Sequence, residues 1–189
     1  MHQPSDALLA ARSAATLNLI DADANPGGLQ IWSGGEPDLG RDIYPIPAHA
    51  TGTAYSEGDY VTAGLHYYRA ENSGTSAGAT PTWPTDGGTV TDNDITWQDM
   101  GEIPALLGIL SFTQPAGTIS GHTLSLTIAG TPTASQSGTA TWARIVNGAD
   151  GLVYQGDCGT VGSGAFVEMG TLNVVEGGEL RAETLNIWG

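Results

Sequence analysis

The stretch LLGILSFTQPAGTISGHTLSLTIA, residues 106–129, indicates the fold class of this chain. LLGILSF is a short, mostly apolar run, and TLSLTIA at residues 123–129 alternates apolar and polar side chains with the period of a half-buried β-strand. The segment QPAG at residues 114–117 is a turn signal between them. The stretch therefore predicts two β-strands separated by a turn at residues 114–117.

Short strands and turns continue to the C-terminus. Strands are expected at the runs TATWARIVN, GLVYQ, AFVEM, TLNVV and ELRAETLNIW, residues 139–147, 151–155, 165–169, 171–175 and 179–188. The last run changes its apolar face midway, which suggests a bulge or a crossing between sheets. With LQIW at residues 29–32, the chain has about eight strands. The predicted fold is all-β, a jelly-roll-like β-sandwich of about eight strands, and a closed up-and-down barrel is the structural alternative.

One helix is expected, near the N-terminus. Ser5 or Asp6 can cap the run ALLAARSAATLNL, whose leucines and alanines fall near helical spacing. The following segment DADANPGG, residues 21–28, resembles the start of a calcium-binding loop. Pro26 then stands where that loop needs glycine, and Trp32 stands where it needs glutamate. The better interpretation is a turn that ends the helix.

The middle of the chain does not continue the strand pattern. RDIYPIPAHATGTAY, residues 41–55, is a proline-containing exit linker, and GEIPALL at residues 101–107 is the return. We therefore expect a discontinuous sandwich of residues 1–46 and 104–189, with residues 47–103 forming a small inserted β module. Such an insertion costs little stability where its two ends lie close together.

The charge of the chain limits its partners. Acidic residues outnumber basic ones twenty to five, every basic residue is arginine, and the formal net charge is −15. Contacts with phosphate backbones and anionic lipids depend on lysine and arginine, so no direct nucleic-acid or membrane partner is expected. The N-terminus lacks a signal-peptide pattern, and no run approaches the roughly 20 apolar residues of a membrane helix. The expected product is soluble and stays where it is made or leaves by lysis.

No motif nominates a catalytic residue, a cofactor or a metal. The four histidines are dispersed, and HExxH, GxSxG, Walker and GxGxxG patterns are absent from the sequence. Ser163 lies in a Gly-Ser-Gly turn, and the single cysteine, Cys158, is either a small buried hydrophobe or a nucleophile. We expect no enzyme, although a carboxylate pair for glycoside hydrolysis remains an alternative because its spacing is three-dimensional.

Aromatic residues gather in the expected insertion. Six of the thirteen aromatics lie between Tyr55 and Trp97. Some of them should form a small core: Tyr60, Tyr67 and Trp97, together with Val61. Tyr68 alternates with Tyr67, and Trp83 lies between two prolines, so these two rings are the candidates for exposed contact with a glycan.

The same segment resembles the small chitin- and cellulose-binding modules of the family 5/12 type, in the variant found in phage structural proteins. The resemblance covers residues 54–101, and it rests on Ala54-Tyr55, Gly58-Asp59-Tyr60-Val61, Gly64, Tyr67-Tyr68, Ala70, Pro81, Trp83-Pro84, Thr96-Trp97 and Gly101. It implies a compact β module with a possible glycan as ligand.

The flanking parts are similar to small β-rich virion proteins of tailed phages, some of which decorate or cement the capsid. The N-terminal helix, LQIWSGGEPD, LSFTQPAG, GTATWARIVNGADGLVYQGDCGTVGSGAFVEM and the VVEGG turn carry this resemblance. It implies a capsid decoration protein, made in the bacterial host cytoplasm and located on the virion. Its partners would be the major capsid protein and further copies of itself, as a dimer or trimer. A tail- or fibre-associated protein, or a free glycan-binding adhesion protein, is the alternative.

Overall fold

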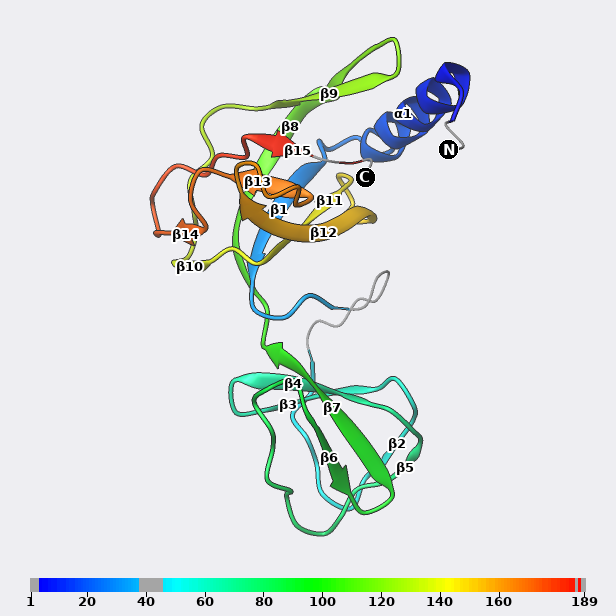
Figure 1. Cartoon of the computed structure of the whole chain (residues 1–189), viewed down its shortest axis with the longest axis vertical. Coiled ribbons are helices and arrows are strands. Elements are labelled where there is room, and N and C mark those ends of the chain that lie inside the picture. Colours follow the sequence, from blue (N-terminus) through cyan, green and yellow to red (C-terminus); the bar gives the residue numbers. More distant parts are fainter. Residues whose placement is uncertain (1–3, 38–45, 186, 188–189) are drawn as a thin grey trace. The chain divides into compact units, whose positions relative to one another are not determined.

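The computed structural model describes residues 4–37, 46–185 and 187, and the chain forms two compact units (Figure 1). Unit 1 comprises Met1–Ser33 and Ala105–Gly189, and unit 2 comprises Gly34–Pro104. The expected boundary after residue 46 therefore comes too late. Directly after Ser33, the chain already joins unit 2, because the amide of Gly35 donates to the carbonyl of Glu102 over 2.8 Å.

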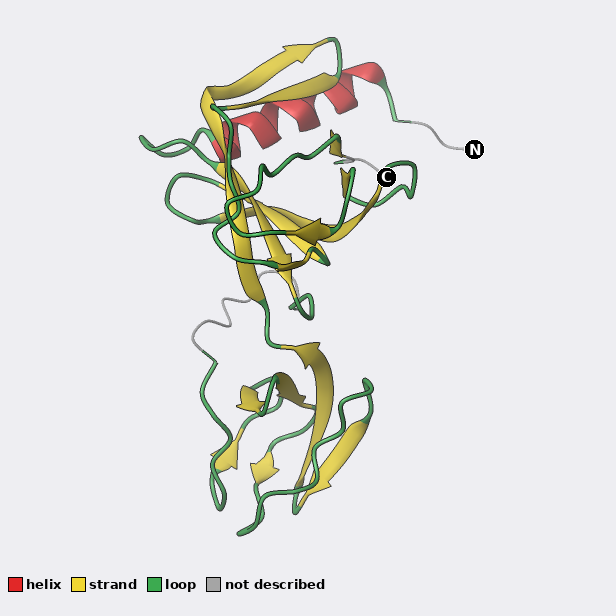
Figure 2. Cartoon of the chain, turned by 90° about the vertical axis from the view of Figure 1, so that its left-hand side faces the viewer, coloured by secondary structure: helices red, strands yellow, loops and turns green. Residues whose placement is uncertain are grey.

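The predicted N-terminal helix is present as α1, Asp6–Ile20, the only helix in the described part of the chain (Figure 2). The Ser5 hydroxyl caps it by accepting a hydrogen bond from the Leu8 amide over 3.3 Å. One side of the helix is buried at Ser13, Thr16 and Ile20, and the Ser13 hydroxyl donates to the carbonyl of His122 over 2.6 Å. The helix thus packs on the hairpin formed by β8 (Ala105–Ser120) and β9 (Thr123–Ile128) in unit 1.

Unit 1 is built on one large curled sheet, which confirms the all-β prediction. The strands of the sheet, in spatial order, are β15 (Thr184–Leu185), β13 (Val167–Met169), β12 (Leu152–Thr160), β11 (Trp142–Val146), β1 (Gly28–Ser33), β8 (Ala105–Ser120) and β9 (Thr123–Ile128). All neighbours are antiparallel except β12 and β13. A separate pair consists of β10 (Gly138–Thr139) and β14 (Asn173–Val174).

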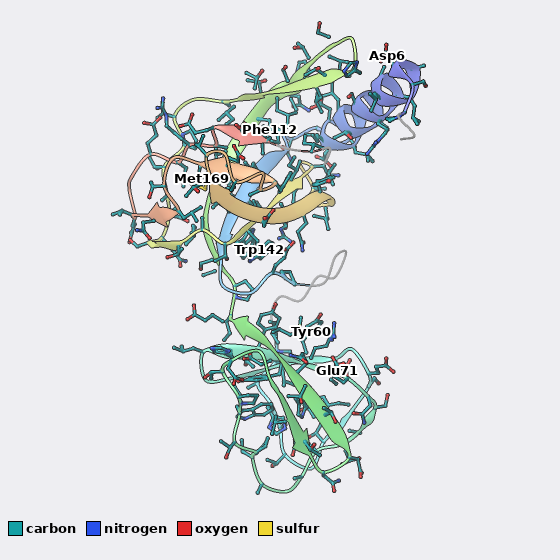
Figure 3. The ribbon with its side chains drawn as sticks, in the orientation of Figure 1. Asp6, Tyr60, Glu71, Phe112, Trp142 and Met169 are labelled. Atoms are coloured by element: carbon teal, nitrogen blue, oxygen red, sulfur yellow. The ribbon has the colours of Figure 1, made fainter. Side chains whose placement is uncertain are left out.

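Alternation along the central strands places one apolar set inside the curl. Leu29 and Ile31 on β1 and Ala143 and Ile145 on β11 are fully buried in the core of unit 1. Figure 3 shows the side chains of the same unit, whose core also includes Phe112 and Met169. The two edge strands, β9 and β15, contribute side chains to one cavity of about 360 Å³. The sheet therefore curls until its edges face a common space without pairing with each other.

Two details of the predicted strands are wrong. The expected turn at residues 114–117 lies inside β8, where the pairing with β9 shifts register between Phe112 and Gly117. The chain reverses at Gly121 instead, with φ of +63°. The irregular backbone at Ala116 donates to the carboxylate of Asp21 over 3.0 Å, so the bulged strand keeps its hydrogen bonding without a turn.

The predicted strand at residues 179–188 is mostly irregular where the structure describes it. Only Thr184–Leu185 is a strand, while the amides of Leu180 and Glu183 donate to the carbonyls of Pro132 and Glu168. These bonds to separate segments replace a continuous ladder. Trp188 of the same prediction lies outside the described residues.

Unit 2 is a small β module with two covered faces. Its sheet has the order β3 (Tyr60–Ala63), β4 (His66–Ala70), β7 (Ile95–Glu102) and β6 (Thr89–Asp92), and β2 (Ala54–Tyr55) pairs with β5 (Gly74–Thr75). Val61, Tyr68 and Trp97 form a core on one face, and Tyr60 and Tyr67 form another on the opposite face. The sheet is thus packed on both sides.

Candidate binding face of the inserted unit

The aromatic face of unit 2 is built around Tyr68, which is fully buried. Its hydroxyl donates to the carbonyl of Pro84 over 2.7 Å, and its ring centroid lies 4.3 Å from that of Trp83. Burial, followed by the nearby charge of Asp99, raises the pKa of Tyr68. The prediction that Tyr68 presents an exposed ring for glycan contact is therefore wrong. The strand alternation that turns it away from Tyr67 is present, but the Trp83 loop covers the face to which it points.

Trp83, the second sequence candidate, is half-buried and packs against the same core. Its ring centroid lies 5.0 Å from that of His49, with the two rings nearly perpendicular. Tyr55 is also half-buried, and its ring centroid lies 6.1 Å from that of His49, with the two ring planes nearly parallel. The partly exposed rings of the described part of unit 2 are therefore Tyr55 and Trp83, and both lie near the ring of His49.

Sequence reasoning missed His49 and Tyr55 as members of this face. His49 lies in the proline-containing segment, and its isolated position gave no motif. Tyr55 belongs to the stretch that carries the family resemblance, which is the signal that could have found it. The remaining assignments to the core are confirmed, since Tyr60, Tyr67 and Trp97 are buried.

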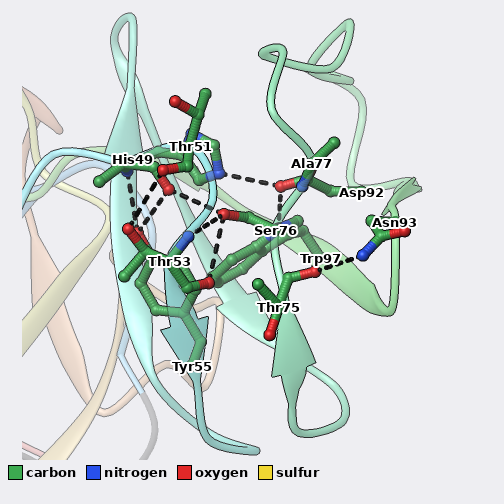
Figure 4. Close-up of polar contacts among 11 residues, drawn as sticks. His49, Thr51, Thr53, Tyr55, Thr75, Ser76, Ala77, Asp92, Asn93 and Trp97 are labelled. Atoms are coloured by element: carbon green, nitrogen blue, oxygen red, sulfur yellow. Dashed lines mark hydrogen bonds and ion pairs between the residues drawn. The ribbon is translucent and has the colours of Figure 1, made fainter.

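A buried histidine–carboxylate pair fixes His49 (Figure 4). Its Nε2 donates to Oδ2 of Asp92 over 2.9 Å, and both side chains are almost inaccessible. The same carboxylate accepts hydrogen bonds from the amide of Ala77 and the indole nitrogen of Trp97, over 2.9 and 3.2 Å. The buried carboxylate of Asp92 therefore connects the loop at Ala77, the core ring of Trp97 and His49 through hydrogen bonds.

Ser76 lies near this pair but does not form a catalytic triad with it. The Ser76 hydroxyl donates to the carbonyl of Ala50 over 2.9 Å and accepts from the amide of Thr53 over 3.0 Å (Figure 4). A nucleophile of this kind would need its hydroxyl hydrogen-bonded to the histidine base. These bonds instead attach the β2–β5 region to the preceding loop.

A second pair, His66 and Asp99, lies on the same face of the sheet. Nδ1 of His66 donates to Oδ1 of Asp99 over 2.8 Å, and Gly101 and Gly87 donate their amides to the two carboxylate oxygens over 2.9 and 3.0 Å. Burial acts to raise the pKa of Asp99, but these hydrogen bonds, first that of His66 and then those of Gly87 and Gly101, outweigh it and lower the pKa. Asp99 thus stays an ionised acceptor that holds the Trp83 loop to β7.

The other sequence candidates are structural in the part of the chain described. In the Gly-Ser-Gly turn, Gly162 and Gly164 donate their amides to the carboxylate of Glu168, over 3.1 and 2.8 Å. The hydrogen bond from Gly162 has the larger effect and that from Gly164 the next, and together they lower the pKa of the Glu168 carboxyl. Cys158 is half-buried and packs against the core of unit 1.

The segment that resembles a calcium-binding loop uses its oxygens within the protein. Oδ1 of Asp23 accepts from the Asn25 amide over 3.1 Å, which is the geometry of a turn. Within the described ranges, no group of three or more histidine, cysteine, aspartate or glutamate side chains is placed to hold a metal ion. No described helix is long and apolar enough to cross a membrane.

Searches of protein-family models, curated proteins and solved structures found no match to this chain. The geometry alone therefore defines the candidate site. It is the partly exposed pair Tyr55 and Trp83 on unit 2, whose rings lie near His49 of the His49–Asp92 pair.

Proposed function

We propose that this chain is a phage virion structural protein, a capsid decoration or cement protein that binds the major capsid protein through unit 1. Unit 2 would serve as a displayed module. The supporting observation is the way the insertion leaves unit 1. Ser33 and Ala105, the residues that bound it, face each other in the β1–β8 ladder. A module of 71 residues, from Gly34 to Pro104, is thus inserted without interrupting the sheet.

The use of polar groups supports a structural role rather than catalysis. The buried carboxylates of Asp92, Asp99 and Glu168 each accept hydrogen bonds from loop amides. A buried carboxylate that bridges several elements makes a small β module rigid. Rigidity of this kind suits a protein that must survive on the outside of a particle.

The charge supports a protein partner in preference to the packaged genome. A formal net charge of −15 repels phosphate groups. It favours a partner whose surface is basic, or at least less acidic than this chain. The major capsid protein is the proposed partner, since the resemblance of the flanking parts points to decoration proteins.

The test compares particles with and without this chain. Heads that lack it should lose resistance to heat and osmotic shock, and adding back the purified chain should restore that resistance. A variant that lacks unit 2, with Ser33 joined to Ala105 by a short glycine-serine linker, should restore it as well as the full chain does. Unchanged resistance of heads that lack the protein would overturn the proposal.

A second candidate function is glycan binding by unit 2, which the partly exposed rings of Tyr55 and Trp83 favour. Aromatic faces pack well against the C–H faces of sugars. Calorimetric titration with chitin oligosaccharides or peptidoglycan fragments should give a binding heat that Tyr55→Ala abolishes. The absence of heat with every glycan in the wild-type chain would exclude this function.

A further inference from the structure

The free edge of strand β9 offers a surface that fits a second copy of this chain. β9 is the last strand of the large sheet and, in the part of the chain that the structure describes, pairs only with β8. Within the described residues, no other segment forms a backbone hydrogen bond with residues 123–127. An edge strand with open amides and carbonyls is a template for pairing with another strand.

Proteins normally protect such an edge with charge or proline on the strand itself, and β9 carries neither; the nearest acidic side chain across the cavity is that of Glu183 in the C-terminal segment. Residues 103–143 contain no Asp, Glu, Lys or Arg, although the chain carries a formal net charge of −15. Two copies of so acidic a protein repel each other over most of their surface. The uncharged hairpin of β8 and β9 is where they can approach with the least repulsion.

The sequence of β9 is also self-complementary. Residues 123–127 read Thr-Leu-Ser-Leu-Thr, which is the same in both directions. In an antiparallel pair related by a two-fold axis at Ser125, each residue lies opposite a residue of the same type in the second copy. Thr123 faces Thr127 of the second copy, Leu124 faces Leu126, and Ser125 faces Ser125. A two-fold interface uses the same patch on both subunits, which a palindromic strand satisfies.

The side chains on both faces of this strand suit the pairing. Thr123, Ser125 and Thr127 are exposed and form a hydroxyl face, and cross-strand threonine and serine pairs are favourable. Leu124 and Leu126 are half-buried, pack against the core and line the cavity between β9 and the C-terminal segment. A second β9 would continue this apolar row and cover its open side.

We propose that this chain forms a two-fold dimer by antiparallel pairing of β9 with β9 of a second copy, which joins the two large sheets into one. This inference does not rest on the proposed function. It needs only the open edge, the neutral hairpin and the palindromic strand.

A matched pair of charge variants tests the interface by sedimentation of the full chain over a range of concentrations. Ser125→Glu places two like charges opposite each other at the axis, and should raise the dimer dissociation constant at least about tenfold. Thr118→Glu is the control, because Thr118 is directly opposite Ser125 on β8, is also exposed, and lies one strand further from the proposed two-fold axis. It adds the same charge and should leave the dimer unchanged.

A cysteine pair tests the position of the axis. Residues opposite each other in an antiparallel pair have Cα atoms about 4.5–5.5 Å apart, within the roughly 4.4–6.8 Å that a disulfide spans. Ser125→Cys should form a covalent dimer under mild oxidation, whereas Thr118→Cys and the wild-type chain with Cys158 should not. The proposal is overturned by a wild-type chain that is monomeric at every concentration, or by a dimer that Ser125→Glu leaves intact. A wild-type monomer would point to a strand from a different protein.

Discussion

Replacement of Asp99 by asparagine tests the buried carboxylate that holds unit 2 together. Asp99 accepts three hydrogen bonds, from His66 and Gly101 on one oxygen and from Gly87 on the other. Asparagine keeps one acceptor oxygen. Its least costly orientation keeps the bonds to His66 and Gly101 and turns the amide nitrogen towards the donor of Gly87. The charge-assisted hydrogen bond from Gly87 is then lost. The hydrogen bonds from His66 and Gly101 remain, but their acceptor is no longer charged.

The magnitude follows from these bonds. A hydrogen bond to a charged group contributes about 1.5–3 kcal/mol, and Gly87 is exposed, so water can replace part of the lost bond. We expect Asp99→Asn to lower the free energy of unfolding of unit 2 by about 2 kcal/mol, a fall in Tm of roughly 8–16 °C for a unit of this size. Glu57→Gln is the control, because it removes the same charge from an exposed side chain and should change stability by less than about 0.5 kcal/mol.

The pH dependence gives the same prediction a second readout. The pKa of Asp99 is lowered in the folded state, so its contribution is present above its unfolded pKa of about 3.9 and is lost as the pH falls through the folded value. The difference in the free energy of unfolding between wild type and Asp99→Asn should therefore be largest at pH 7 and should shrink below about pH 4. Hydrogen exchange of the full chain, followed in peptides from β4 and β7, measures it. Equal protection of the two proteins at pH 7, or a difference that persists at the lowest pH, would refute the reasoning.

Three further predictions concern other parts of the molecule. Glu168→Gln should destabilise unit 1 at neutral pH but not in acid, because the carboxylate has a lowered pKa and contributes only while it is ionised; thermal unfolding at two pH values checks this. Tyr68→Phe should lower stability by about 1–3 kcal/mol by leaving the Pro84 carbonyl without its donor, as urea unfolding should show, and an unchanged midpoint would contradict the contact. Gly148→Ala should destabilise because its new Cβ would overlap a neighbouring backbone carbonyl, whereas Gly78→Ala, with open space around it, should be tolerated; matching melting curves for the two would be inconsistent with the packing.

The fold class could be predicted because local rules and tertiary structure agree over most of unit 1. A serine cap and apolar spacing gave α1, and alternation of Leu124, Leu126 and Ile128 gave β9. The turn expected at residues 114–117 was wrong because a turn signal describes only local preference. The bulge there is satisfied by Asp21, a residue distant in the sequence, and no local pattern reveals such a partner.

The candidate face could be predicted only in part, for a similar reason. Alternation correctly placed Tyr67 and Tyr68 on opposite sides of β4. It could not show that both sides are covered, since the cover over Tyr68 depends on the Pro84 carbonyl and on the ring of Trp83. His49 entered the face through Asp92, 43 positions further along the chain. Two residues so far apart in the sequence form no motif with a recognisable spacing, so the contact could not be predicted from the sequence.

The abundance of the chain in purified particles tests the proposed function most directly. Quantitative mass spectrometry should be applied to virions of a phage that encodes it, and to the tails and heads separated from them. A decoration protein predicts many copies in the head fraction, in fixed proportion to the major capsid protein, and none in the tail fraction. Absence of the chain from both fractions would contradict the account, and recovery with the tails alone would contradict its assignment to the capsid.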